Sequence, residues 1–420
     1  LAQHTTRVDG DALARLVRGC HELIASTHEL AAGDTDEETH AEYVHRLSRK
    51  FVQSPDLRVA WLHVLAEYHV ARRNFEEAAQ TYVLIGVLVA EYLRLLERGF
   101  GAAHFRVHEF ESLCPNLRAE LAVMPSGDEL DEVRGDVAQS TLFSMDGFAD
   151  VLAKAIGLLR EGGFHETSLA SYHLLLPLHW RAENYAAQRA AVRDMRKLLD
   201  KIVQSKREDV RQFASYYRVA FLGAAWGDEL NGRAFVYKER PHFRLMDMTA
   251  KLRLQFGGGD APPLEMLPNT LAARTDEAKH RAATDRRYVH VVGVTPYLDD
   301  AELAARRGRF ERNFNLARFT YETPFTTTGK TQGALDEQCK RKTVLRTAAA
   351  FPHWFKRLPV EHESSSDLSP IETATEIVTS KTHNLRLEID APRPSSKQLQ
   401  MQLQGTLLTA VHAGPLSILD

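Results

Sequence analysis

Residues 319–360, FTYETPFTTTGKTQGALDEQCKRKTVLRTAAAFPHWFKRLPV, are the stretch that decides the fold of this chain. Aromatic and polar residues alternate over residues 319–325, which predicts a half-buried β-strand. Residues 326–330 (TTTGK) predict a turn, with a glycine where a positive φ is needed. Residues 339–347 return to β-prone side chains with a basic face. Taken alone, this strand, turn and strand are typical of a hairpin in an α+β domain, and they contain no catalytic constellation.

The chain before this hairpin has the pattern of helices. Residues 54–56 (SPD) predict a helix start, with a serine cap, a proline in the first turn and an acid near the positive end of the dipole. The next helix is expected to begin after Asn74 and to stop at Gly99. This pair suits a tetratricopeptide-like hairpin, and a second pair is expected within residues 147–202. A steady period of about 34 residues, which a true repeat array would show, is not found.

One helical face is more apolar than a solvated helix tolerates. It belongs to the helix after Asn74 and consists of Val83, Val87, Ala90 and Leu93. Two interpretations remain open. The face is either buried inside the helical array or forms a surface at which two copies of the chain make a homodimer.

After residue 205 the period changes from helical to β. Strands are predicted at 213–221, 234–238 and 288–297, and helices at 246–256, 299–309, 369–387 and from 397 onward. Residues 264–285 are polar and are expected to be mobile, and residues 364–367 are predicted to be a polar linker. A helix start is again indicated by the run SPIE at 369–372, which places a cap, a proline and an acid in their preferred positions.

These patterns together predict a mainly α chain with one β lobe, an α+β fold in three lobes. Lobe A is a helical array at residues 1–205. Lobe B is an antiparallel β lobe at residues 206–365. Lobe C, at residues 366–420, is a partial helical bundle.

Composition excludes several classes of protein. With 420 residues the chain is too long for a single core. A net charge of −3 argues against a nucleic-acid-binding protein. The three cysteines are few and lack metal-ligand spacing, so a reducing cytoplasmic location is expected. No apolar run is long enough for a transmembrane segment, and because the chain begins at Leu1 without a signal peptide, we expect a fragment of a longer protein.

Conventional active sites are not indicated. Each His-Glu pair lacks the second histidine that a zinc protease needs, and no Walker motif, dinucleotide fingerprint or nucleophile elbow occurs. The glycine-rich residues 257–260 lack the preceding strand of a phosphate-binding loop. His104, His108 and Cys114 could together bind a metal, but two partly helical histidines are more often surface residues. The prediction is no metal and no cofactor.

The amino-acid sequences of several segments resemble those of one known family. The runs YETPFT, EQCKRKT, FPHWFKRLPV and RFERNFNLARFTYETPFT resemble the guanine-nucleotide exchange domain of the DOCK family, called DOCK homology region two. SPDLRVAW and NFEEAAQTYVLIGVLVAEYL are similar to its first lobe, YYRVAFLG with AFVYKE to its second, and SPIETA with LQMQLQGTLLTAVHAGPL to its third. The resemblance covers nearly the whole chain in the family's order, and it is greatest to the zizimin-related branch.

This resemblance implies an exchange factor for Rho-family small GTPases of the Rac or Cdc class. Such a protein catalyses GDP release without covalent chemistry, and it needs no cofactor of its own beyond the GDP and magnesium of its partner. The family's nucleotide sensor is a valine that displaces the magnesium, and the matching position is Val411, within a helix interruption that includes His412, Gly414 and Pro415. The implied GTPase-binding residues are Met401, Gln404, Gly405, Tyr321, Thr323, Pro324, Phe325, Gln338, Lys340 and Arg341.

The resemblance also implies a homodimer through lobe A and a cytoplasmic protein, with any recruitment to membranes left to regions outside this chain. Two departures stand out. The family's third lobe continues well beyond the sensor, so we expect the broken helix to be incomplete in a chain ending at Asp420, and His412 stands where the family has asparagine. Two rival classes remain: a non-catalytic helical-repeat scaffold, and an enzyme of unknown chemistry that uses a histidine-rich surface.

Overall fold

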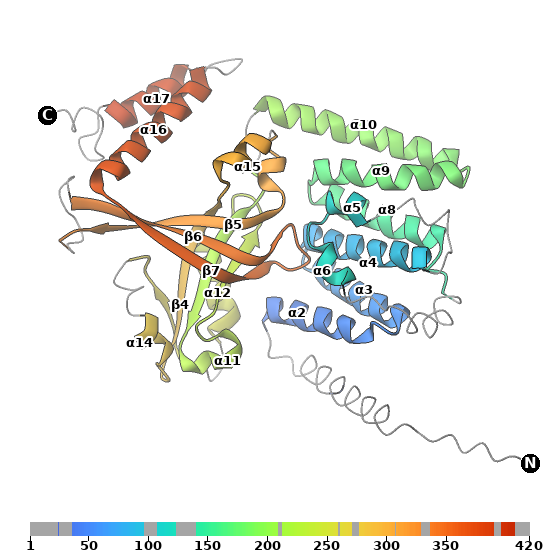
Figure 1. Cartoon of the computed structure of the whole chain (residues 1–420), viewed down its shortest axis with the longest axis horizontal. Helices are drawn as coiled ribbons and strands as arrows, with labels where there is room; N and C mark the ends of the chain where they lie inside the picture. Colours follow the sequence, from blue (N-terminus) through green and yellow to red (C-terminus); the bar gives the residue numbers. More distant parts are fainter. Residues whose placement is uncertain are drawn as a thin grey trace, which may run out of the picture.

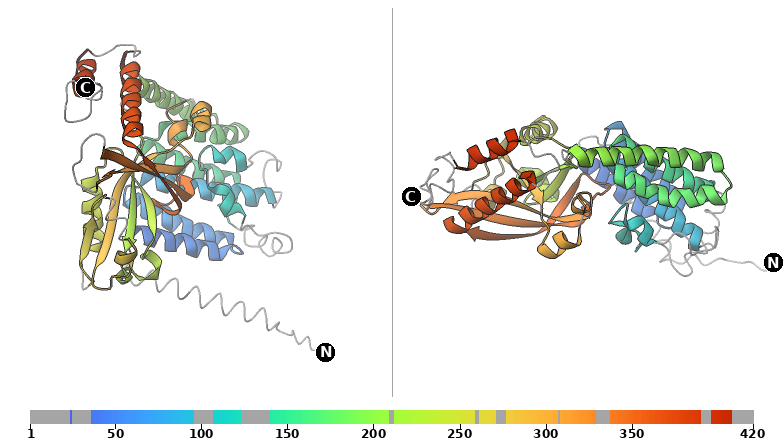
Figure 2. Two further views of the ribbon diagram at one scale, coloured as in Figure 1. Left: turned by 60° about the vertical axis from the view of Figure 1, so that its left-hand side comes forward. Right: turned by 90° about the horizontal axis from the view of Figure 1, so that it is seen from above.

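The computed structural model describes residues 24, 36–95, 107–122, 140–208, 212–258, 261–270, 277–306, 308–328, 337–389 and 396–407. Within these ranges the chain forms an array of helices, then a β-barrel, then a pair of helices (Figure 1). The pair lies beside the barrel on the side away from the array (Figure 2). The predicted α+β class is confirmed.

Lobe A is a layered array of antiparallel helices. Its elements are α2 (Glu37–Ser48), η1 (Arg49–Phe51), α3 (Pro55–Ala71), α4 (Phe75–Leu95), α5 (Val107–Glu111), α6 (Leu117–Leu121), α8 (Met145–Glu161), α9 (His165–Arg181) and α10 (Tyr185–Glu208). The predicted start of α3 is confirmed, with Ser54 at the N-cap position and Pro55 in the first turn, although among the described residues the serine side chain makes no capping bond.

Three connections in this array share one turn geometry. Each has a residue with a positive φ just after the helix, which is the left-handed cap that ends many helices. The three residues are Arg73 (φ 59°), Gly163 (φ 80°) and Glu183 (φ 52°). The next residue donates a backbone hydrogen bond to the carbonyl five residues earlier, at 2.8–2.9 Å in each case. The array is therefore more regular than the sequence period indicated, because the shared feature is a backbone conformation that three different residue types adopt.

The apolar face of α4 is interior. Val83 and Val87 are fully buried, and Ala90 and Leu93 are nearly so. The reason is that α4 packs against α3 on one side and α8 on the other. Of the two interpretations open at the sequence level, burial is the one found, and this face offers no surface to a second copy.

Lobe B is a closed, mainly antiparallel barrel. Its strands are β1 (Ser215–Leu222), β2 (Ala234–Glu239), β3 (Leu264–Leu267), β4 (Arg287–Pro296), β5 (Leu316–Thr326), β6 (Gln338–Phe351) and β7 (Arg357–Leu368). They follow the order β1-β2-β7-β6-β5-β4-β3, and β1 also pairs with β4, which closes six strands into a ring and leaves β3 parallel to β4 outside it. The remaining elements are η2 (Ala224–Trp226), α11 (Gly227–Leu230), α12 (Leu245–Phe256), α14 (Glu277–Arg281), α15 (Asp300–Ala305) and η3 (Glu311–Asn313).

Two apolar clusters hold lobe B together, and they use opposite faces of the same strands. One fills the barrel and includes Tyr216, Phe319, Leu345 and Phe351. The other lies between the outer face of β1, β2 and β4 and helix α12, and it includes Phe221 and Trp226. This division follows from the alternation of side chains along each strand. The predicted strand pair at 319–347 is confirmed, because it lies within β5 and β6.

Three local predictions for this part of the chain were wrong. Residues 364–367 are not a linker, because β7 continues through them. Their cross-strand partners in β6 supply the stabilisation that their own polar composition lacks: the hydroxyls of Thr343 and Ser365 lie 3.0 Å apart. Residues 264–285, expected to be mobile, instead contain the regular elements β3 and α14, and the helix predicted to reach 309 ends at Ala305.

The connection between β6 and β7 reaches into lobe A (Figure 1). Its Trp354 is 3% exposed and belongs to the apolar core of the helical array. Two lobe A side chains bind the backbone here. His69 Nε2 lies 2.9 Å from the carbonyl oxygen of Trp354, and the amide of Asn116 donates to the carbonyl of Pro352 at 3.0 Å and both donates to and accepts from Ala350 at the end of β6. The run FPHWFKR, which contributed to the family resemblance, is therefore a structural joint.

A buried cation completes this joint. The guanidinium of Arg357 donates to both carboxylate oxygens of Glu42 at 2.7 and 3.0 Å, to the hydroxyl of Thr39 at 2.8 Å and to Asp36 at 3.3 Å. All three acceptors lie at the start of α2 and in its first turns. We call Asp36, Thr39, Glu42, Trp354 and Arg357 the A–B joint, and it makes lobes A and B one packed unit.

The elements of lobe C are α16 (Pro370–Ile389) and α17 (Ser396–Leu407), which pack against each other. The predicted start of α16 is confirmed, since Ser369 and Glu372 bond reciprocally across its first turn. Helix α16 also contacts β6 and β7, so it continues directly from the barrel.

Candidate functional site

The predicted partner-binding residues of lobe B meet on one two-stranded ribbon. In the antiparallel register of β5 and β6, Thr323 lies opposite Arg341, Pro324 opposite Lys340, and Phe325 opposite Cys339. Gln338 lies opposite Thr326 at the same end. Residues that the sequence separates by more than a dozen positions are thus adjacent, and we call Pro324, Phe325, Gln338, Lys340 and Arg341 the ribbon surface.

Two of the predicted residues are buried, although the register places them on the same face of the ribbon as Phe325 and Arg341. Tyr321 is 4% exposed and belongs to the barrel core, and Thr323 is fully buried, with its hydroxyl donating to Asn269 Oδ1 at 3.0 Å. Their side chains therefore support the ribbon from inside and do not offer a contact to a partner. Pro324 and Gln338 are exposed, while Phe325 is half-buried beneath the guanidinium of Arg341.

The basic run of β6 is neutralised within the chain. Lys340 pairs with Glu322 at 2.7 Å, and Lys342 pairs with Glu376 of α16 at 2.9 Å. Arg341 donates from Nε and Nη2 to the two carboxylate oxygens of Asp367, at 2.6 and 2.7 Å. This bidentate bond raises the pKa of Arg341 and lowers the pKa of Asp367. A partner would meet alternating charges here, not the positive patch that the sequence alone suggests.

The Lys342–Glu376 pair also connects the ribbon to lobe C. On α17, Met401 is 56% exposed and Gln404 is exposed, while Gly405 lies in the same helix. Val411, His412, Gly414 and Pro415 lie outside the described residues. The structure therefore brings the lobe B residues together and places Met401 and Gln404 on an exposed helix, and the sensor role of Val411 stays a prediction.

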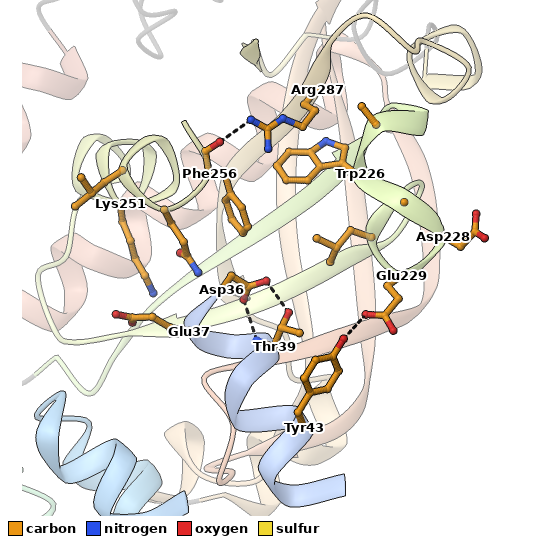
Figure 3. Close-up of a pocket in the computed structure, with 15 residues that line it drawn as sticks. Asp36, Glu37, Thr39, Tyr43, Trp226, Asp228, Glu229, Lys251, Phe256 and Arg287 are labelled. Carbon is orange, nitrogen blue, oxygen red and sulfur yellow. Dashed lines mark hydrogen bonds between the residues drawn. The ribbon is translucent and has the colours of Figure 1, made fainter. Parts of the chain in front are cut away.

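A hollow of about 900 Å3 lies between α2 of lobe A and η2, α11 and α12 of lobe B (Figure 3). Its polar groups are already bound. Tyr43 donates to Glu229 at 3.0 Å, Arg287 donates to the carbonyl of Phe256 at 2.7 Å, and Lys251 is held by two carboxylates at 2.7 and 2.9 Å. The arrangement contains no nucleophile beside a base, so this hollow has the character of a lobe boundary and not of an active site.

Metal and thiol chemistry find no support in the described part of the chain. There, no group of three or more His, Cys, Asp and Glu side chains is placed to hold a metal ion. Of the three ligands considered from the sequence, His104 lies outside the described residues, His108 is exposed and Cys114 is buried. Burial raises the pKa of the Cys114 thiol to about 12, so it stays protonated.

Across the ranges that the structure describes, no helix is both long and apolar enough to cross a bilayer.

Comparison with known proteins agrees with this architecture. The family model described as DHR-2, Lobe A matches residues 42–204, and that described as DHR-2, Lobe B matches residues 274–350. The chain belongs to the dedicator of cytokinesis (DOCK) family, in its DHR-2 region. Neither of these two matches reaches lobe C.

Individual relatives match over almost the whole chain. Dedicator of cytokinesis protein 8 of Mus musculus is 32% identical over 404 residues, which are 96% of this chain and 19% of the relative. Dedicator of cytokinesis protein 7 of Homo sapiens is 32% identical over 414 residues, 97% of this chain and 19% of the relative. Dedicator of cytokinesis protein 9 of Mus musculus is 28% identical over 421 residues, 96% of this chain and 20% of the relative. The chain thus spans about a fifth of the length of these curated relatives.

Proposed function

We propose that this chain is a guanine-nucleotide exchange module that accelerates GDP release from a Rho-family small GTPase of the Rac or Cdc class. The observation that carries the proposal is the match to the models of DHR-2 lobe A and DHR-2 lobe B, since the DOCK proteins that contain this domain are exchange factors for Rho GTPases. The geometry is compatible with it. Pro324 and Gln338 of the ribbon surface and Met401 and Gln404 of α17 are exposed, and the Lys342–Glu376 pair joins the two lobes that would contact the GTPase.

The proposed mechanism is electrostatic. A small GTPase holds GDP partly through a magnesium ion that offsets the charge of the β-phosphate. Placing an apolar side chain where the ion sits removes this neutralisation in a partly desolvated site, and each loss of about 1.4 kcal/mol weakens nucleotide binding tenfold. Val411 suits this role because its side chain is small, stiff at χ1 and unable to replace the charge of the metal.

The test combines binding and exchange assays on this chain extended through the rest of lobe C. The proposal predicts preferential capture of nucleotide-free Rac or Cdc protein and accelerated release of fluorescent GDP. Val411→Ala should slow release steeply while leaving the melting temperature and the capture of empty GTPase nearly unchanged. Val64→Ala, at an exposed valine of α3, is the matched control and should not affect release.

The outcomes also separate the rival classes. A scaffold would bind the GTPase without regard to its nucleotide, or not at all. If Val411→Ala kept full exchange but lowered the free energy of unfolding by the amount expected for a core valine, on the order of 1–3 kcal/mol, Val411 would be a packing residue. A free-standing lobe A scaffold is already disfavoured, because Trp354 of lobe B completes the lobe A core.

We also propose that two copies associate through α10, since the α4 face is buried. Apolar residues spaced by seven run along the exposed side of α10: Tyr185, Val192 and Leu199, each about half exposed, with Trp180 and Val203 nearby. Helix α10 lies at the outer edge of the array (Figure 1). In an antiparallel pair of α10 helices centred on Val192, Tyr185 of one copy would face Leu199 of the other, which gives the self-complementarity of a two-fold interface.

A further inference from the structure

The barrel of lobe B is packed at one end and hollow at the other. The inward face of β1 runs from Tyr216 through Arg218 to Ala220, and that of β2 runs back from Val236 to Ala234. Ala220 lies directly opposite Ala234 in the β1–β2 register, and Gly232 follows at the turn before β2. These residues fill little of the interior. A cavity of about 300 Å3 remains at this end, bounded by β1, β2, β7 and Arg281 of α14, and we call it the barrel-mouth cavity.

Three guanidinium groups line this cavity. Arg218 is 3% exposed and pairs with Glu363 at 2.7 Å, so its positive charge is compensated by this carboxylate. Arg233 and Arg281 are exposed at the rim. Within the described residues their hydrogen bonds go to backbone carbonyls, of Glu229 at 3.2 Å and of Gly232 at 3.1 Å, and not to carboxylates. Two positive charges with donors to spare therefore stand at the mouth of a polar cavity.

Other charges near the rim do not cancel these two. Glu361 also lines the cavity, but it lies 3.7 Å from Arg346 of β6, a residue outside the lining. Glu363 is the partner of Arg218. The carboxylates of the lining are thus each matched by an arginine other than Arg233 and Arg281.

Gly232 fixes one of the two rim arginines in place. Its φ of +75° is a left-handed conformation that suits glycine. A Cβ atom at this position would lie 3.1 Å from both Cζ and Nε of Arg281, closer than ordinary packing allows. The absence of a side chain thus lets the guanidinium lie against the turn and bond to its carbonyl. Arg281 is held at the rim by the backbone itself, which reduces the entropy lost when it binds a ligand.

We infer that the barrel-mouth cavity binds a small phosphate-bearing ligand, with Arg233 and Arg281 donating to the phosphate oxygens. A phosphate group offers several acceptor oxygens to planar guanidinium groups, and such charge-assisted bonds are among the strongest in proteins. The cavity volume is at the lower end of the range for small-molecule sites, which also favour the mouths of β-barrels. This inference is independent of the exchange activity.

The test is a titration of the 420-residue chain with inorganic pyrophosphate, followed by isothermal calorimetry at low salt. Arg233→Gln with Arg281→Gln should weaken binding by about tenfold or more, because two charged donors are lost. Gly232→Ala should also weaken it by displacing Arg281. Arg286→Gln is the matched control: this neighbouring arginine is exposed and pairs with Glu265 instead of lining the cavity, so its loss should leave the affinity unchanged.

A second arm identifies the source of the phosphate. Phosphatidylcholine vesicles containing phosphatidylinositol bisphosphate should sediment with the chain, and release it on addition of pyrophosphate, if the ligand is a lipid headgroup. Pyrophosphate binding without vesicle binding assigns the cavity to a diffusible phosphate compound. The inference is overturned if pyrophosphate does not bind saturably, or if the double variant binds it as tightly as the unmodified chain while melting at the same temperature.

Discussion

Arg357 is the residue whose loss should cost the A–B joint most. Arg357→Met keeps much of the side-chain volume but removes every donor to Glu42, Asp36 and Thr39. Removing one partner of a buried ion pair costs about 3–5 kcal/mol, because a charge is left without compensation. Glu42 is one-third exposed and can turn toward water, whereas Asp36 is 5% exposed and cannot. Asp36 keeps its bonds to the first backbone groups of α2, so the expected loss is at the lower end, about 3 kcal/mol.

The assay is urea unfolding followed by tryptophan fluorescence, since Trp354 lies in the same joint. Arg341→Met is the matched control, because Arg341 makes an equally short bidentate bond to Asp367 but is one-third exposed. An exposed pair of this kind is worth about 0–1 kcal/mol. Equal losses for the two variants, or a loss below about 1 kcal/mol for Arg357→Met, would show that the joint does not depend on this buried charge.

Three further expectations can be measured directly. Burial lowers the pKa of His69 to about 4 and that of His353 to about 3, below the usual 6.5. The contribution of the two neutral histidines to stability should therefore be full above pH 6.5 and should fall as the pH drops from there toward 4. A His69→Gln variant, which keeps a donor but cannot be charged, should show a shallower fall in melting temperature over this range. Sedimentation at micromolar concentration should give the mass of two chains, and Leu199→Lys should give one, whereas Leu254→Lys on lobe B should remain a dimer. Because Met401 is exposed and flexible, exchange on Rac as well as Cdc proteins is expected in parallel assays, and strict selectivity for Cdc would contradict this.

The parts of the fold that the sequence predicts are those with a strong local pattern. The strands around Phe319 and Leu345 alternate clearly, and the helix starts at Pro55 and Pro370 combine a cap with a proline, so both kinds of element are found where expected. No local pattern predicts the end of β7, because residues 364–367 are polar on both faces. That segment is a strand through its pairing with β6, which no local pattern records.

The candidate site was predictable only in part, for a similar reason. The family resemblance indicates which residues of β5 and β6 matter, but not that Thr323 points inward or that Arg341 is already bound to Asp367. The A–B joint could not be found from local signals, since Arg357 and Glu42 are separated by 315 positions. An arginine after FPHWFK gives no sign of such a partner.

The insertion of Trp354 into lobe A has a consequence for how the protein is made. On the ribosome, the helices of lobe A are synthesised long before the β6–β7 connection that covers part of their core. Until residue 357 has been added, the nascent array has an open apolar site where Trp354 will pack. Contacts between residues so far apart in the sequence form late in folding. The growing chain must therefore keep this opening from other hydrophobic segments throughout the synthesis of the barrel, which makes the unfinished lobe A the stage at which chaperones have most to protect.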